Sequence, residues 1–220
     1  MTSNLMKIKE KISNAAKAAN RAENDIKLVA VSKIHGEETI RPVLEAGHTL
    51  FGENRVQEAA QKWPALKEEF PGIELHLIGP LQTNKVRQAI GLFDVIETVD
   101  RPKLARAIAR ICDEENINCP IYIQVNTGLE DQKAGISPDQ VDELIRLCRD
   151  ELHLTVSGVM CIPPFDEDPT EHFKLLKSIA DRNNIEHISM GMSGDFEKAI
   201  AHGATHVRVG TAIFGTRLGY

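Results

Sequence analysis

The sequence has few of the features that mark membrane, secreted or metal-dependent proteins. Its 220 residues include four cysteines, two tyrosines and one tryptophan. No apolar run reaches the ~18 residues that a membrane span needs. The cysteines show neither the CxxC spacing of thioredoxin-type sites nor a paired zinc motif. We therefore expect no metal site and four reduced, packed thiols, which are Cys112, Cys119, Cys148 and Cys161.

The charge distribution excludes two further classes of protein. The chain carries 26 basic and 32 acidic residues, a formal net charge of −6, and the basic residues are scattered. A nucleic-acid groove or a membrane-binding patch would need them clustered. The first twenty residues lack the apolar stretch of a signal peptide, so we expect a cytoplasmic protein.

A regular alternation of short apolar runs and helix-like stretches organises the chain. The apolar runs are rich in Val, Ile and Leu, as expected of strands buried on both faces. They begin near Lys27, His48, Ile73, Phe93, Pro120, Leu154, Glu186 and Ala204. The helix-like stretches between them include residues 38–46, 55–62, 101–115, 138–149, 169–182 and 196–201.

This alternation predicts a parallel sheet of eight strands, closed into a (β/α)8 barrel. The alternative is an open doubly wound sheet, but the GxGxxG fingerprint is absent after the first strand. No linker divides the chain, so we expect one domain over residues 1–220. Within it, residues 1–24 form an amphipathic helix with Leu5, Ile8 and Ile12 on one face, and residues 27–217 form the barrel.

The first candidate functional residue is a lysine at the end of the first strand. Alternation puts Val29, Val31 and Lys33 on one face, so we expect Lys33 to continue an apolar, inward-facing row. Desolvation favours the neutral, nucleophilic amine, which Schiff-base formation with an aldehyde requires. The alternative is a lysine that simply emerges into solvent.

The loops after the seventh and eighth strands predict a phosphate site. Ser193 lies in the run GMSGDF before the helix at 196–201, and Gly210 and Thr211 follow the last strand. These two loops of (β/α)8 barrels recurrently bind phosphate, because helix amino termini favour anions. The alternative is that they are glycine-rich turns and nothing more.

Two further polar residues complete the predicted site. Arg208, in the last strand, could contact a ring nitrogen or a phosphate. Asn54, after the second strand, could either donate and accept hydrogen bonds in the barrel mouth or cap the next helix. An aldehyde-reactive lysine together with a phosphate site fits pyridoxal 5′-phosphate. A sugar-phosphate aldolase has the same two features, so the residues alone leave both open.

Six ordered motifs resemble a known family. They are KLVAVSK, FGENRVQEA, LHLIGPLQTNK, SGVMCIPP, SMGMSGDFEKAI and VRVGTAIFG, and they cover about residues 27–217. The chain resembles the pyridoxal phosphate homeostasis proteins, which bind this vitamin B6 cofactor. The resemblance implies a single (β/α)8 barrel similar to the N-terminal domain of alanine racemase.

The resemblance also implies a role for each candidate residue. Lys33 matches the family lysine that holds the cofactor as a Schiff base. Arg208 matches the arginine facing the pyridine nitrogen, which it would keep unprotonated because a guanidinium donates only. Asn54 looks like a ring-side contact. The residues that match phosphate-binding positions are Ser193, Gly210 and Thr211.

The function implied is pyridoxal phosphate homeostasis, by buffering the cofactor and delivering it transiently to apo-enzymes. This role affects amino-acid and keto-acid balance. It implies no catalytic reaction, so we expect no catalytic residue. The alternative is a single-domain racemase or lyase that depends on pyridoxal phosphate. The racemases resembled here take a second base, a tyrosine, from another domain, for which we expect no room after Tyr220. Tyr122 is expected in packing. We further expect a monomer, and a second, weaker cofactor site near Lys85, Arg87 and Lys133 stays open.

Overall fold

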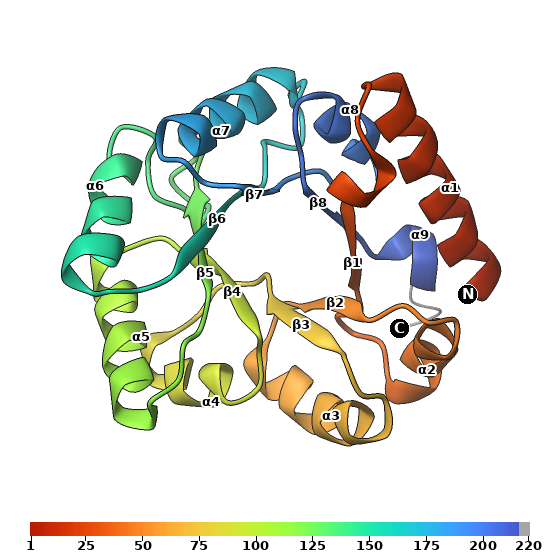
Figure 1. The fold of residues 1–220 in the computed structure, drawn as a ribbon, viewed down its shortest axis with the longest axis horizontal. Coiled ribbons are helices and arrows are strands. Elements are labelled where there is room, and N and C mark those ends of the chain that lie inside the picture. Colours follow the sequence, from red (N-terminus) through yellow and green to blue (C-terminus); the bar gives the residue numbers. More distant parts are fainter. Residues whose placement is uncertain (216–220) are drawn as a thin grey trace.

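Eight parallel strands follow one another around a closed barrel in sequence order (Figure 1). The computed structural model describes residues 1–215, so the last two residues of the predicted barrel, 216–217, and Tyr220 lie outside the described residues. The ring closes where β8 pairs with β1, with Ala30 opposite Val209. The strands are β1 (Lys27–Val31), β2 (Leu50–Glu53), β3 (Glu74–Leu77), β4 (Val95–Val99), β5 (Ile121–Val125), β6 (Val156–Cys161), β7 (His187–Ser189) and β8 (His206–Val209). The predicted barrel is confirmed, and the open sheet is excluded.

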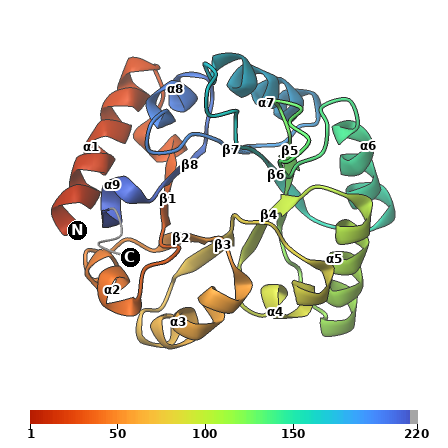
Figure 2. The same cartoon turned by 180° about the vertical axis from the view of Figure 1, so that it is seen from behind.

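Helices surround the barrel on all sides, as the view from behind also shows (Figure 2). They are α1 (Thr2–Ala18), α2 (Glu37–Glu45), α3 (Val56–Glu69), α4 (Val86–Ile90), α5 (Pro102–Glu115), α6 (Val141–Arg146), α7 (Thr170–Arg182), α8 (Phe196–Ala201) and α9 (Thr211–Phe214). The helix predicted over 138–149 is wrong in its bounds, because α6 begins only at Val141 and continues as a π-helical turn over Leu147–Glu151.

The amphipathic helix at the amino terminus belongs to the outer ring. It packs against α8 and α9 beside β1 (Figure 1). Its buried residues follow the predicted helical spacing and are Leu5, Ile8, Ile12 and Ala16. The helix ends at Ala18, earlier than the predicted residue 24, and Asn20 has a positive φ just beyond it.

The apolar core lies between the sheet and the helices, whereas much of the barrel interior is polar. Buried polar side chains reach inward from β3, β4, β7 and β8, among them His76, Glu97, Ser189 and Arg208. The strands are buried on both faces, as predicted, but the inner face is far less apolar than the Val/Ile/Leu-rich reading implied. All four cysteines are buried and free, which confirms the predicted packed thiols. None of the described helices is long and apolar enough to cross a bilayer.

Candidate functional site

The structure brings all six predicted site residues to one cavity at the carboxyl ends of the strands. The cavity has a volume of about 520 Å³, within the usual range for small-molecule sites. Its lining includes the predicted residues Lys33, Asn54, Ser193, Arg208, Gly210 and Thr211. They come from the ends of β1, β2, β7 and β8, so the barrel collects them from distant parts of the chain.

Lys33 lies at this cavity, but its surroundings differ from the prediction. Strand β1 ends at Val31, and Lys33 is exposed rather than desolvated. The following residue, Ile34, has a left-handed backbone with φ of 64°, so the strand geometry that would keep Lys33 in the inward row does not continue. Within residues 1–215, the amine of Lys33 forms no hydrogen bond or ion pair, and it is available to a ligand.

Asn54 is half-buried between β2 and α3. The helix cap is Arg55, so the alternative role of Asn54 as a cap is not observed. The loop after β3 packs directly on its backbone, since a Cβ built at Gly79 would lie 2.2 Å from the carbonyl oxygen of Asn54. Glycine at position 79 therefore allows the close approach that fixes Asn54.

The three residues predicted to bind phosphate lie in the turns after β7 and β8. Ser193 is exposed, in the loop that leads to α8, and Thr211 is exposed at the first position of α9. Gly210 brings the last turn against β1, because a Cβ there would lie 3.0 Å from the carbonyl oxygen of Val31. Two accessible hydroxyl groups thus line the same cavity as the Lys33 amine.

Arg208 differs from the other lining residues because it is almost fully buried, at 4% exposure. Its Nη1 donates to Ser189 Oγ at 2.7 Å, and its Nη2 donates to the carbonyl oxygen of Cys161 at 2.8 Å. Strands β7 and β6 therefore hold the guanidinium in one orientation. The group can only donate hydrogen bonds to a ligand.

A chain of polar groups, buried except for Glu74 at its far end, continues from Arg208 through the barrel. Ser189 Oγ donates to Glu97 Oε2 at 2.6 Å, and His76 Nδ1 donates to Glu97 Oε1 at 2.6 Å. His76 Nε2 lies 2.9 Å from Glu74 Oε1. Burial opposes a charge on His76, but the hydrogen bonds to Glu74 and Glu97 prevail and raise its pKa to about 9. We refer to Glu74, His76, Glu97 and Ser189 as the interior chain.

Glu97 is ionised in this arrangement. Its complete burial alone would raise its pKa, but the hydrogen bond and charge of His76, with the charge of Arg208, hold that pKa below the usual value. The sequence reading missed the interior chain. Its signal was the alternation of polar and apolar residues in the runs ELHL and HIS, whereas the run VIETV, which contains Glu97, does not alternate.

His35 lines the cavity and is also a residue that the sequence reading missed. Its ring packs against Phe214 with 5.2 Å between centroids. Burial, followed by the nearby charge of Lys62, lowers the pKa of His35, so its ring is neutral near pH 7. Its position two residues after Lys33 was the feature of the sequence that could have placed it at the cavity. The predicted packing of Tyr122 is confirmed: its hydroxyl group lies 3.1 Å from His187 Nδ1 inside the barrel.

The fold and the position of the cavity define a barrel of the alanine racemase type. The family model described as the alanine racemase N-terminal domain matches residues 4–218. A solved alanine racemase from Clostridium difficile 630 superposes with a TM-score of 0.74 at 18% identity, covering 99% of this chain and 58% of the racemase. At that identity the likeness concerns the fold alone.

Relatives of higher identity specify the family within this class. A pyridoxal phosphate homeostasis protein from Aquifex aeolicus is 40% identical over 97% of this chain and 96% of its own length. The structure of PipY from Synechococcus elongatus PCC7942 with pyridoxal phosphate bound is 35% identical, with a TM-score of 0.80, and covers 93% of this chain and 100% of that one. The chain belongs to the family of pyridoxal phosphate homeostasis proteins, as its six motifs predicted.

Proposed function

We propose that this protein binds pyridoxal 5′-phosphate in the cavity, holds it as a Schiff base on Lys33, and buffers and delivers it as a cytoplasmic monomer. The observation that carries the proposal is the convergence of six separately predicted residues on one cavity of suitable volume. The PipY structure with the cofactor bound supports the choice of ligand.

The residues at the cavity fit the chemical groups of this cofactor. When bound, the cofactor supplies an aldehyde that condenses reversibly with a primary amine, with loss of water. Lys33 offers an exposed amine, and Ser193 and Thr211 offer hydroxyl donors for a phosphate. Arg208 offers only hydrogen-bond donors, so a ring nitrogen facing it stays unprotonated. A cofactor with an unprotonated ring nitrogen is a weaker electron sink than a cofactor whose ring nitrogen faces a carboxylate. This difference favours storage of the cofactor over catalysis.

The binding proposal is tested by the visible absorption band of the loaded protein, followed by borohydride reduction and peptide mapping. We expect the band in the wild type and the reduced adduct on Lys33. The matched control is Lys198→Ala, because Lys198 is exposed and pairs with Asp168 at 2.8 Å outside the cavity. Lys33→Ala should lose the band, and Lys198→Ala should keep it. An unchanged band in Lys33→Ala would refute the assignment of Lys33. If the wild type stayed colourless after cofactor was added, cofactor binding would be refuted and the sugar-phosphate aldolase would become the favoured alternative.

The delivery part of the proposal needs its own experiment. The loaded protein is mixed with an apo-aminotransferase in the presence of a phosphatase that destroys free pyridoxal phosphate. We expect reactivation of the aminotransferase faster than free cofactor supports under the same conditions. Reactivation no faster than with free cofactor would mean that the protein stores the cofactor without handing it over.

A second candidate function, a racemase or lyase dependent on pyridoxal phosphate, is favoured by one observation. His35 lines the same cavity as Lys33 and is neutral near pH 7, so it could accept a proton there. The test is incubation of the loaded protein with single L-amino acids, with chiral analysis for D-enantiomers and detection of keto acids. Turnover that disappears in His35→Ala would establish this second function. The absence of turnover in the wild type would favour the proposed role as a carrier of the cofactor.

A further inference from the structure

The backbone that carries Lys33 has a costly conformation. Ile34 has φ of 64°, and among residues 1–215 it is the one β-branched residue with a positive φ. This region disfavours side chains branched at Cβ, so the surrounding structure must hold the residue there. Ile34 cannot owe its conformation to burial of its own side chain, because that side chain is 55% exposed.

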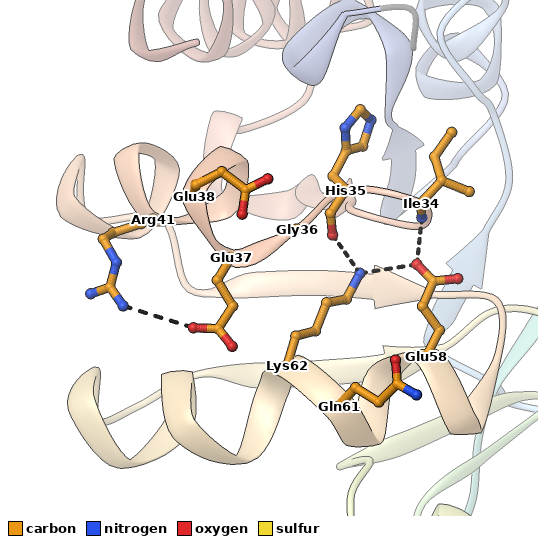
Figure 3. Close-up of a pocket in the computed structure, with 9 residues that line it drawn as sticks. All are labelled: Ile34, His35, Gly36, Glu37, Glu38, Arg41, Glu58, Gln61 and Lys62. Atoms are coloured by element: carbon orange, nitrogen blue, oxygen red, sulfur yellow. Dashed lines mark hydrogen bonds and ion pairs between the residues drawn. The ribbon is translucent and has the colours of Figure 1, made fainter. Parts of the chain in front are cut away.

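Two side chains of α3, those of Glu58 and Lys62, bind the backbone around Lys33; Figure 3 shows their bonds to Ile34 and His35. The carboxylate of Glu58 accepts a hydrogen bond from the N–H group of Ile34. The ammonium group of Lys62 donates to the carbonyl oxygen of Ser32 at 3.0 Å and to that of His35 at 2.9 Å. Three backbone groups around Lys33 are therefore bound to one helix, whereas the Lys33 side chain is left to solvent.

The two helix residues also bind each other. Lys62 Nζ lies 3.1 Å from Glu58 Oε1, one helical turn away, and 2.8 Å from Glu53 Oε1 on β2. The Lys62 side chain is 8% exposed and that of Glu53 is fully buried, so these are desolvated charges with a fixed geometry. A buried lysine with its donors committed in this way is a rigid support, unlike a surface lysine.

We propose that Glu58 and Lys62, which we name the α3 clamp, are positioning residues that direct the Lys33 amine toward the cavity. The clamp holds the strained turn at Ile34, and that turn sets the direction in which the side chain of Lys33 leaves the barrel. This proposal rests on the proposed binding of pyridoxal phosphate to Lys33. Without the clamp, the turn relaxes to a negative φ and the amine loses its fixed approach to an aldehyde.

Glu58 is the residue through which the clamp can be tested without unfolding the protein. Removing Lys62 would leave the buried Glu53 without its ion pair and would confuse a positional effect with a general loss of stability. The Glu58 side chain is 28% exposed, and its removal leaves the Lys62–Glu53 pair in place. Glu58→Gln is the conservative variant, since its amide oxygen still accepts from the Ile34 N–H group.

The matched control is Glu69→Ala. Glu69 also lies on α3 and also forms an ion pair, but with Arg41 of α2 rather than with the turn that carries Lys33. For each variant we would measure the melting temperature, hydrogen exchange of the Ile34 amide in the cofactor-free protein, the dissociation constant for pyridoxal phosphate, and the fraction of borohydride-trapped cofactor found on Lys33.

We expect Glu58→Ala to raise the exchange rate of the Ile34 amide and to weaken cofactor binding by about ten-fold or more, the usual effect of losing a charge-assisted hydrogen bond. The fraction trapped on Lys33 should fall in favour of other lysines. Glu58→Gln should restore most of the binding, and Glu69→Ala should behave as the wild type in every measurement.

Faster exchange at Ile34 with unchanged affinity and unchanged trapping on Lys33 would overturn the positioning role and leave the clamp a purely structural contact. Unchanged exchange at Ile34 would overturn the clamp itself. Failure of the wild type to bind the cofactor would refute the proposed function and with it the role toward Lys33, and the exchange measurement would still decide whether Glu58 holds the turn.

Discussion

The hydrogen bond between Arg208 and Ser189, 2.7 Å from Nη1 to Oγ, has a fixed direction. A guanidinium only donates, so the serine oxygen must accept, and its own proton goes to the carboxylate of Glu97 at 2.6 Å. The orientation of an arginine at the cavity therefore depends on an ionised carboxylate on a strand halfway around the barrel. The interior chain links the candidate site to the core of the barrel.

Replacing the middle of this chain should loosen Arg208. Ser189→Ala removes one of the two buried hydrogen-bond partners of Arg208 and one of the two of Glu97. We therefore expect the free energy of unfolding to fall by about 1–3 kcal/mol, together with weaker cofactor binding. Urea titration and a binding isotherm measure the two effects. Ser178→Ala, at an exposed position on α7, is the control and should stay within about 0.5 kcal/mol. If both variants denature at the same urea concentration, the interior chain contributes nothing to stability.

The interior chain also predicts a loss of stability at alkaline pH. The pKa of His76 is raised from its ordinary value of 6.5 to about 9 in the folded protein. The stability that its charge provides is fully present below pH 6.5 and is lost as the pH rises toward 9, at most about 3 kcal/mol. Urea titrations between pH 6 and 10 should show this slope. His76→Gln should be less stable and lack the slope, whereas His202→Gln should retain it. A flat profile in the wild type would contradict the charged state of His76.

His206 gives the opposite dependence on the acid side. Burial lowers its pKa to about 3, with Glu97 opposing the shift and His76 adding to it. A histidine held neutral in the folded state contributes stability that is present above its unfolded pKa and lost as the pH falls through the folded one. We therefore expect the free energy of unfolding to decline below pH 6.5, and replacing His206 by Gln to reduce that decline. An unaltered acid limb in His206→Gln would assign the decline to other groups.

Gly79 should be intolerant of a side chain. A methyl group there would meet the carbonyl oxygen of Asn54 at 2.2 Å, so the loop after β2 must move. Such crowding costs about 1–3 kcal/mol, and we expect Gly79→Ala to lower both the melting temperature and cofactor affinity. Gly194→Ala is the control, because a Cβ there meets no atom within 4 Å. Equal behaviour of the two variants would show that the packing at Asn54 is not critical.

The four cysteines should be unreactive in the folded protein. All are buried, and burial raises the pKa of Cys119, Cys148 and Cys161 to about 12 each. Thiolates, not thiols, react with disulfide reagents, so titration at pH 8 should be slow until denaturant is added, when all four groups react. A fast-reacting thiol in the native protein would show that one of these sites opens to solvent.

The alternation of strands and helices could be predicted from the sequence because each buried strand of a parallel sheet is a short apolar run, and each connection is long enough for a helix. The position of the site followed from the same pattern, since loops at the carboxyl ends of strands must meet at one end of the barrel. Residues as far apart as Lys33 and Thr211 were therefore assigned correctly to one place. Their roles toward a cofactor stay predictions.

The surroundings of individual side chains were harder to predict. The exposure of Lys33 depends on where β1 ends and on a left-handed turn at Ile34. A β-branched residue such as isoleucine disfavours that conformation, so the sequence does not predict the turn. The interior chain was missed because its members lie within apolar runs, although His76 and Ser189 each stand between two apolar residues. The tertiary contacts that settle both features come from other strands and from α3.

The pairing of β1 with β8 has a consequence for how a bound ligand affects opening of the barrel. Lys33 follows the first strand, and Gly210 and Thr211 follow the last strand. A ligand that contacts all three residues therefore bridges the seam where the first strand pairs with the last and closes the barrel. Such a ligand binds the closed ring and not a ring open at that seam, and it stabilises the closed ring by mass action. On the proposed function, the protein without cofactor would therefore open at this seam more often than the loaded protein.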